Sequence, residues 1–244
     1  MKSTFHKDFF IVAENWNIEE LSALTHYLEI TEGKMQLFDS MLHHNLYLAS
    51  TTPNYDLTGI FDQTLIQSHP LLTVTFVDNH DSQPLQALES YVEFWFRPLA
   101  YALILLREQG IPCVFYPDLY GAKYIDKTDE GYDTGVELVA LQALPQMLGI
   151  RKDLAYGIQR DYLDHPNCIG WTRAGLAEKE GSGIAVLMSN GGGGIKLMEI
   201  GTAHAGKVMT DALGGRIEDV LIDENGFGEF YCNAGSVSVW VLSA

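Results

Sequence analysis

The stretch TVTFVDNHDSQP, residues 73–84, carries an apolar run directly into a cluster of polar side chains. Its first half is made of valine, threonine and phenylalanine, residue types that favour strands. Its second half begins with DNHD at residues 78–81 and continues with SQP, where the proline interrupts the run. The stretch therefore predicts a buried strand that ends by presenting four polar side chains at the rim of a sheet.

The same alternation of a strand with a following helix extends to both sides of this stretch. Apolar runs predict strands, and apolar residues at helical spacing predict the helices that follow them. The predicted strands are residues 8–14, 34–42, 71–79 and 111–121, and the predicted helices are residues 17–30, 43–50, 91–109 and 136–148. Four β–α units in about 150 residues favour an α/β fold with parallel strands.

Past residue 158 the pattern changes to short β-rich runs that glycine and asparagine separate. Examples are GIAVLMSN at residues 183–190 and SVSVWVL at residues 236–242. Runs of this kind without a helical period predict antiparallel strands. We expect residues 158–244 to form an antiparallel β-sandwich and residues 1–157 to form the α/β domain.

The composition limits the partners of the chain. Its 244 residues carry a formal net charge of −17 with only 15 lysines and arginines. This charge repels the phosphates of nucleic acids and of anionic membranes, whereas a neutral polyol is compatible with it. The three cysteines, Cys113, Cys168 and Cys232, are odd in number and widely spaced, as in a cytoplasmic protein with reduced thiols. We expect no membrane contact, because no apolar run reaches the roughly 18 residues of a membrane span.

Polar residues that could take part in catalysis follow the predicted strands. In parallel α/β barrels the catalytic side chains come from the carboxyl ends of the strands, because the loops converge there. Glu14 and Trp16 follow the first predicted strand, and residues 78–81 follow the third. The two carboxylates Glu14 and Asp81 suit glycosidic bond cleavage. In that reaction one carboxyl protonates the leaving oxygen while others stabilise or attack an oxocarbenium-like centre.

The residues alone also allow other interpretations. A glutamate that follows a strand, such as Glu14, often only caps a structural element or faces the solvent. DNHD equally fits a turn with Asx hydrogen bonds, or a metal site built from His80 and two aspartates. Asp39 in the second predicted strand, and Tyr116 with Asp118 in the fourth, are further polar candidates.

Several stretches resemble one protein family. FVDNHDSQP at residues 76–84 and FFIVAENW at residues 9–16 are similar to two signature regions of the alpha-amylase family of glycoside hydrolases. WFRPLAYALILLREQGIPCVFYPDLYG, DHPNCIGWTR and NAGSVSVWV resemble the bacterial liquefying and cytoplasmic alpha-amylases in particular. The resemblance implies the second half of a (β/α)8 TIM barrel, strands five to eight, followed by an antiparallel β-sandwich. It also implies retaining endo-hydrolysis of α-1,4-glucosidic bonds in starch, glycogen or maltodextrin, with an α-glucan as the partner.

The resemblance also implies roles for individual residues. Glu14 matches the general acid/base, which protonates the departing sugar and then activates water. Asp81 matches the carboxylate that orients the sugar hydroxyls and stabilises the transition state. The other matching positions are implied to bind the substrate, and they are Trp16, Asn79, His80 and Gln83.

One expected group has no match in the sequence. A retaining glycosidase needs a nucleophile roughly 5 Å from the acid. In this family it is an aspartate in a Gly-aromatic-Arg-x-Asp-Ala pattern, and the resemblance begins just before the fifth barrel strand. We therefore expect a carboxyl-terminal portion that is inactive alone, with strand edges that self-association or a complementing amino-terminal fragment covers. The alternative is a non-catalytic glucan-binding or accessory chain.

The resemblance also raises the question of calcium. The liquefying enzymes bridge barrel and sandwich with a calcium site that uses aspartates, and the corresponding positions here are Asn167 and Asn190. Replacing two carboxylates by uncharged amides weakens a site for a hard dication. We therefore predict no metal ligands and no cofactor from these residues, because the resemblance implies that the calcium ligands of the family lie mostly in segments with no match here.

Overall fold

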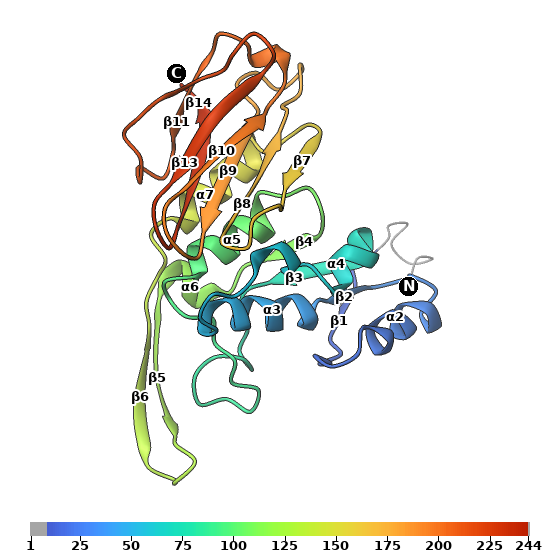
Figure 1. Cartoon of the computed structure of the whole chain (residues 1–244). Coiled ribbons are helices and arrows are strands. Elements are labelled where there is room, and N and C mark those ends of the chain that lie inside the picture. The colour runs from blue at the N-terminus through green and yellow to red at the C-terminus, as the bar shows by residue number, and fades with distance from the viewer. Residues whose placement is uncertain (1–8, 244) are drawn as a thin grey trace.

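The computed structural model describes residues 9–243, and the first part of these forms a parallel sheet (Figure 1). The sheet consists of β1 (Val12–Ala13), β2 (Gln36–Phe38), β3 (Thr73–Phe76) and β4 (Ile111–Cys113), which are neighbours in chain order. All three pairings are parallel, which confirms the predicted arrangement, although each strand is shorter than its apolar run. Asp8 of the first predicted strand, and residues 1–7 of the predicted α/β domain, lie outside the described residues.

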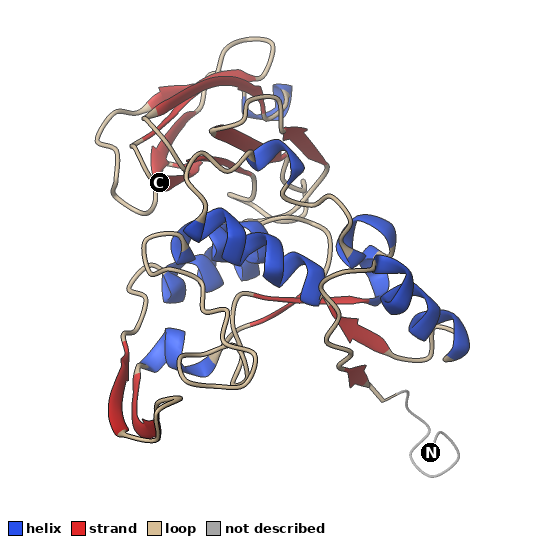
Figure 2. Cartoon of the chain, turned by 60° about the horizontal axis from the view of Figure 1, so that its bottom comes forward, coloured by secondary structure: helices blue, strands red, loops and turns tan. Residues whose placement is uncertain are grey.

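Helices lie between this sheet and the β-rich part of the chain (Figure 2). In chain order, the helices of residues 9–243 are α2 (Leu21–Ile30), α3 (Ser40–Thr51), α4 (Leu65–Ser68), α5 (Arg97–Leu105), α6 (Tyr116–Tyr120) and α7 (Leu144–Asp153), with 3-10 turns η1 (Leu57–Gly59) and η2 (Pro70–Leu72). Helix α2 lies beside the β1 end of the sheet, away from the β-rich part (Figure 1). Helix α5 begins at Arg97 and not at the predicted residue 91, because Pro98 stands in its first turn, where a proline starts a helix, and it ends at Leu105 and not at residue 109. Among the helices of residues 9–243, none is long and apolar enough to cross a bilayer.

The helix predicted at residues 136–148 is wrong over its first half. Residues Asp133–Leu138 form strand β6, which pairs in antiparallel register with β5 (Ala122–Lys127), and α7 begins only at Leu144. The helix prediction overlooked the turn that closes this hairpin, where Gly131 adopts a φ of 86°. The β5–β6 hairpin extends as an arm away from the rest of the chain (Figure 1).

The remainder of the described chain is antiparallel, as predicted. One sheet has six strands, β7 (Gln159–Tyr162), β8 (Cys168–Arg173), β9 (Ile184–Ser189), β14 (Ser236–Leu242), β11 (Val208–Asp211) and β12 (Val220–Leu221), in the spatial order β12-β11-β14-β9-β8-β7. A second sheet pairs β10 (Gly194–Glu199) with β13 (Phe227–Cys232), and η3 (Thr202–His204) follows β10. A buried apolar cluster that includes Met198, Phe230 and Trp240 joins the two sheets.

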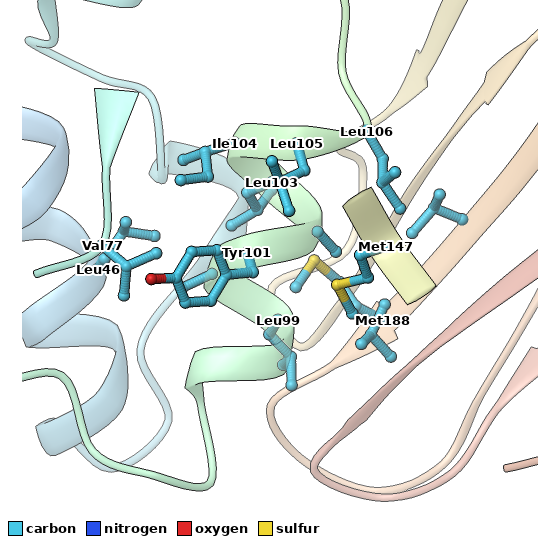
Figure 3. Packing of buried hydrophobic residues seen from close by; sticks show 14 of the residues in the cluster. Leu46, Val77, Leu99, Tyr101, Leu103, Ile104, Leu105, Leu106, Met147 and Met188 are labelled. Atoms are coloured by element: carbon cyan, nitrogen blue, oxygen red, sulfur yellow. The ribbon is translucent and has the colours of Figure 1, made fainter. Parts of the chain in front are cut away.

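The two parts of the chain share one large apolar core. Helix α5 is buried on nearly all sides, and its residues pack with Met147 of α7 and Met188 of β9 (Figure 3). The same cluster includes Ile169 and Trp171 of β8 and Val239 of β14. The indole N–H of Trp171 also donates to the carbonyl oxygen of Leu106, at 3.3 Å. Because the two parts bury this apolar surface against each other, the stability of the β-rich part and that of the helical layer depend on each other.

Candidate active site

The structure brings together the carboxyl ends of β1 and β3. Glu14 follows directly after β1 and is exposed, and Asn79 lies three residues after the end of β3. The side-chain amide of Asn79 donates a hydrogen bond to Oε1 of Glu14, at 3.3 Å. Two of the residues named by the resemblance therefore lie in contact at the same rim of the sheet.

The loop after β3 is an Asx turn, which is one of the alternatives that the residues alone allowed for DNHD. Oδ1 of Asn79 accepts hydrogen bonds from the backbone N–H groups of Asp81 and Ser82, at 2.9 and 2.8 Å. The N–H of Asn79 in turn donates to the hydroxyl of Ser82, at 3.0 Å. Asn79 thus holds Asp81 in place through the backbone while its amide nitrogen reaches Glu14.

His80 and Asp81 stand at the outer side of this turn. Nε2 of His80 lies 3.6 Å from Oδ1 of Asp81, and their side chains are 76% and 42% exposed. Gln83 is half-buried one turn further on, and its backbone carbonyl accepts from the N–H of Gln86. The exposed faces of His80 and Asp81 leave their polar atoms available to a ligand.

Trp16 points into the protein. Its ring packs against His43, with centroids 5.2 Å apart, and against Phe76, with centroids 6.1 Å apart. The ring is half-buried, so only part of its surface remains to contact a ligand. Trp16, His43 and Phe76 therefore form one aromatic cluster next to the ends of β1 and β3, which we call the floor.

His43 is a completely buried part of this floor that the sequence patterns did not single out. It stacks on Phe76 with centroids 5.1 Å apart, and its Nδ1 donates to the carbonyl oxygen of Val77, at 2.6 Å. Its Nε2 lies 2.8 Å from the hydroxyl of Ser90. Burial lowers the pKa of His43 to about 4, more than the bond to Val77 raises it, so the ring is neutral at pH 7.

A buried charged network lies below the rim. Arg97 is 3% exposed, and its Nη1 donates to Oδ1 of Asp118, at 3.2 Å, while its Nε lies 3.9 Å from Oδ2 of Asp78. The hydroxyl of Tyr101 donates to the other oxygen of Asp118, at 2.6 Å. Burial raises the pKa of Asp78 well above its usual range, and the nearby charge of Asp118 adds to this, against the opposing effect of Arg97.

The polar residues that follow β2 and β4 do not lie with Glu14 and Asn79 at the rim. Asp39 is completely buried and accepts backbone N–H bonds from Leu42, Leu65 and Ile66, at 3.1, 3.2 and 2.7 Å, so it caps α3 and the start of α4. Tyr116 is 67% exposed and pairs with the ring of Tyr120. Asp39 is therefore a structural residue, and Asp118 belongs to the buried network.

No metal cluster accompanies these residues. Within residues 9–243, no group of three or more histidine, cysteine, aspartate or glutamate side chains is placed to hold a metal ion. Asn167 and Asn190 contact each other, since the amide of Asn167 donates to Oδ1 of Asn190, at 3.0 Å. The amide of Asn190 donates to the carbonyl oxygen of Tyr55, at 2.7 Å, so direct hydrogen bonds join the helical part to the β-rich part at this point.

Comparisons with known proteins agree with the resemblance. Residues 184–241 match the family described as Alpha-amylase C-terminal. The chain is 48% identical over 237 residues to the cytoplasmic alpha-amylase of Escherichia coli (strain K12), which covers 97% of this chain and 47% of that protein. It is 46% identical over 243 residues to the alpha-amylase of Geobacillus stearothermophilus, which covers 99% of this chain and 42% of that protein. The chain thus spans about half the length of the curated relatives that it matches.

Solved structures show the same fold. The Anoxybacillus alpha-amylase matches with a TM-score of 0.65 at 17% identity, over 99% of this chain and 54% of that one. The alpha-amylase of Geobacillus thermoleovorans, solved as a complex with acarbose, matches with a TM-score of 0.65 at 15% identity, over 100% of this chain and 55% of that one. The chain resembles the bacterial alpha-amylases over nearly its whole length, in a portion that ends with their C-terminal domain.

Proposed function

We propose that the chain is the carboxyl-terminal portion of an alpha-amylase-type glycoside hydrolase that cleaves internal α-1,4-glucosidic bonds in starch, glycogen or maltodextrin with retention. The observation that carries this proposal is the contact between Asn79 and Glu14, with Asp81 held two residues further on by the same asparagine. The 48% identity to an alpha-amylase over nearly the whole chain supports it.

In this proposal two carboxyl groups act on opposite sides of one sugar ring. Glu14 is the general acid/base, which protonates the leaving glycosidic oxygen and then takes a proton from the attacking water. Asp81 orients the hydroxyls of the ring and stabilises the positive charge that develops at the anomeric carbon. His80, Asn79 and Gln83 bind the sugar hydroxyls, and Trp16 forms the apolar floor.

We also propose that this chain alone does not catalyse the reaction, because it supplies no nucleophile. The stretch that comes nearest to the nucleophile pattern of the family is GIQRDYLD at residues 157–164, although it lacks the pattern itself. Its two aspartates are engaged in the β-rich part, where Asp161 binds the guanidinium of Arg107, at 2.7 Å, and Asp164 pairs with Lys196. Neither follows a strand of the parallel sheet, and Asp39 and Asp118, which do, are buried in contacts within the protein. We therefore propose that no aspartate of residues 9–243 performs the covalent step.

The parallel sheet is open at two edges, which supports the proposal that a partner covers them. Strands β1 and β4 are the two ends of the parallel sheet in the described part of the chain. Phe10, Ile11 and Val12 at the β1 edge are 60%, 41% and 36% exposed, and Ile111 in β4 is 37% exposed. An exposed apolar strand edge is a template for pairing, so we propose that a second copy or a complementing amino-terminal fragment completes the barrel here.

A cytoplasmic location is part of the same proposal. All three cysteines are free thiols, as expected for a reducing compartment. One of the similar proteins is named a cytoplasmic alpha-amylase.

Calorimetric titration with maltoheptaose tests the sugar-binding part of the proposal. The 244-residue chain is expected to bind, and Asp81→Asn and His80→Ala are expected to weaken binding, since both side chains are exposed at the rim. Asp129→Asn is the matched control, because Asp129 is exposed between β5 and β6. Equal affinity of all variants, or absence of binding, would contradict the proposed site.

A complementation assay separates the enzyme portion from the alternative, a non-catalytic glucan-binding or accessory chain. The purified chain is mixed with a polypeptide that carries the amino-terminal half of a similar bacterial alpha-amylase, and release of reducing sugar is measured. Hydrolysis that needs both chains and is lost with Glu14→Gln supports the enzyme portion. Full activity of the 244-residue chain alone would refute the absence of a nucleophile.

A further inference from the structure

A cavity of about 460 Å³ lies where the helical layer meets the β-rich part, far along the chain from the rim residues. It is lined by Arg107, Glu108, Leu148, Arg151, Lys152, Ala155, Tyr156 and Arg173. Four of the 15 lysines and arginines of a chain with a net charge of −17 therefore line one cavity. They come from three separate segments, the end of α5, the end of α7 and the end of β8.

Three of these four cations form no ion pair in the described part of the chain, although Glu108 also lines the cavity. Arg107 is paired with Asp161, through bonds of 2.7 and 2.8 Å. Arg151 donates to the backbone carbonyl of Leu105, and Arg173 donates through Nε to the carbonyl of Gly157, at 2.9 Å. These carbonyls are dipoles and carry no net charge. Within residues 9–243, no carboxylate oxygen lies within 4.0 Å of a charged nitrogen of Arg151, Lys152 or Arg173.

Burial makes this arrangement costly. Arg173 is 8% exposed, and burial lowers its pKa. The charge of Glu108 opposes this shift, while the charges of Arg151 and Arg107 lower the pKa of Arg173 further. Burial also lowers the pKa of Arg151. Cations that repel one another in a partly desolvated cavity are stabilised when an anion binds between them.

We propose that this cavity binds the phosphate group of a small phosphate monoester. Arg151 and Arg173 line the cavity with guanidinium groups, whose paired N–H donors match the geometry of a phosphate, and Lys152 adds charge beside them. Leu148, Ala155 and Tyr156 supply an apolar wall for the organic part of the ligand. The volume is in the range of small-molecule sites and exceeds what a bare phosphate ion needs. The site does not depend on glucan binding at the rim.

Thermal unfolding and calorimetry of the 244-residue chain at constant ionic strength test this proposal. Glucose 1-phosphate is expected to raise the melting temperature and to bind saturably, inorganic phosphate to bind more weakly, and glucose and potassium chloride to leave the melting temperature unchanged. Arg151→Gln and Lys152→Gln are each expected to weaken binding roughly tenfold, since each removes one charged donor. Lys152 is exposed, so its variant tests the site without disturbing the core.

Lys127→Gln is the matched control, because Lys127 is an exposed lysine on the β5–β6 hairpin, and it is expected to bind like the parent chain. Equal stabilisation by potassium chloride, or unchanged affinity of the Lys152→Gln variant, would overturn the site. If inorganic phosphate binds as tightly as the ester, the proposed contact of the apolar wall with the organic part of the ligand is wrong, and the cavity is a site for free phosphate.

Discussion

The side-chain amide of Asn79 donates a hydrogen bond to the carboxylate of Glu14, at 3.3 Å, and joins two segments that are 65 residues apart in the chain. The same side chain accepts two backbone hydrogen bonds from the turn that carries Asp81. One residue therefore sets the relative placement of the two carboxylates proposed for the reaction. This relationship follows from the parallel sheet, in which β1 and β3 end at the same edge.

Replacing Asn79 by alanine is expected to weaken maltoheptaose binding roughly threefold to tenfold, because the turn loses both acceptor bonds and Glu14 loses its donor. Calorimetric titration measures the effect. Asn225→Ala, at an exposed position in the β-rich part, should bind like the parent chain. An unchanged affinity in Asn79→Ala would show that this asparagine does not organise the site.

Arg97→Met is expected to lower the free energy of unfolding by about 3–5 kcal/mol. It breaks the buried ion pair with Asp118, at 3.2 Å, and removes the cation nearest to Asp78, and loss of one partner of a buried ion pair is costly. Lys123→Met is the control, because its ion pair with Glu137 is exposed at 75% and 61% and is worth at most about 1 kcal/mol. Urea unfolding monitored by circular dichroism compares the two variants, and equal losses would argue against the network.

The buried imidazole of His43 is expected to make the protein less stable in acid. Its pKa is about 4 in the folded chain and 6.5 without burial, so the folded state holds fewer protons between these values. The contribution is complete above pH 6.5 and is lost as the pH falls through this window, by up to about 3 kcal/mol. His43→Asn keeps a donor for Val77 and should flatten this part of the pH dependence, measured by urea unfolding at several pH values. His26→Asn, at an exposed position, should keep the slope of the parent chain.

Gly194→Ala is expected to lower the free energy of unfolding by about 1–3 kcal/mol, the usual cost of overpacking a core. A Cβ atom at Gly194 would lie 2.3 Å from the sulfur of Cys168 and 3.1 Å from that of Cys232, so the two buried thiols occupy the space that a side chain would need. Gly192→Ala is the control, since a Cβ atom there meets nothing within 4 Å. Equal thermal stability of the two variants would contradict this packing.

Local patterns in the sequence predicted much of the fold. Apolar runs followed by helical periods predicted that β1 to β4 are parallel, and short runs between glycines predicted the antiparallel part. The helix predicted at residues 136–148 was wrong over its first half. Its apolar residues fit either period, and pairing with a second strand decided in favour of β6.

The polar residues show the same division. The sequence by itself determined that Glu14 and residues 78–81 follow strands, because this depends only on neighbours in the chain. Tertiary structure alone decided that Asp39 caps two helices and that Asp78 and Asp118 share one buried arginine. It also decided that cations from three distant segments line one cavity. Burial and electrostatic contact depend on distances in space, and no local pattern of residues encodes the distance between segments that fold together from far apart in the chain.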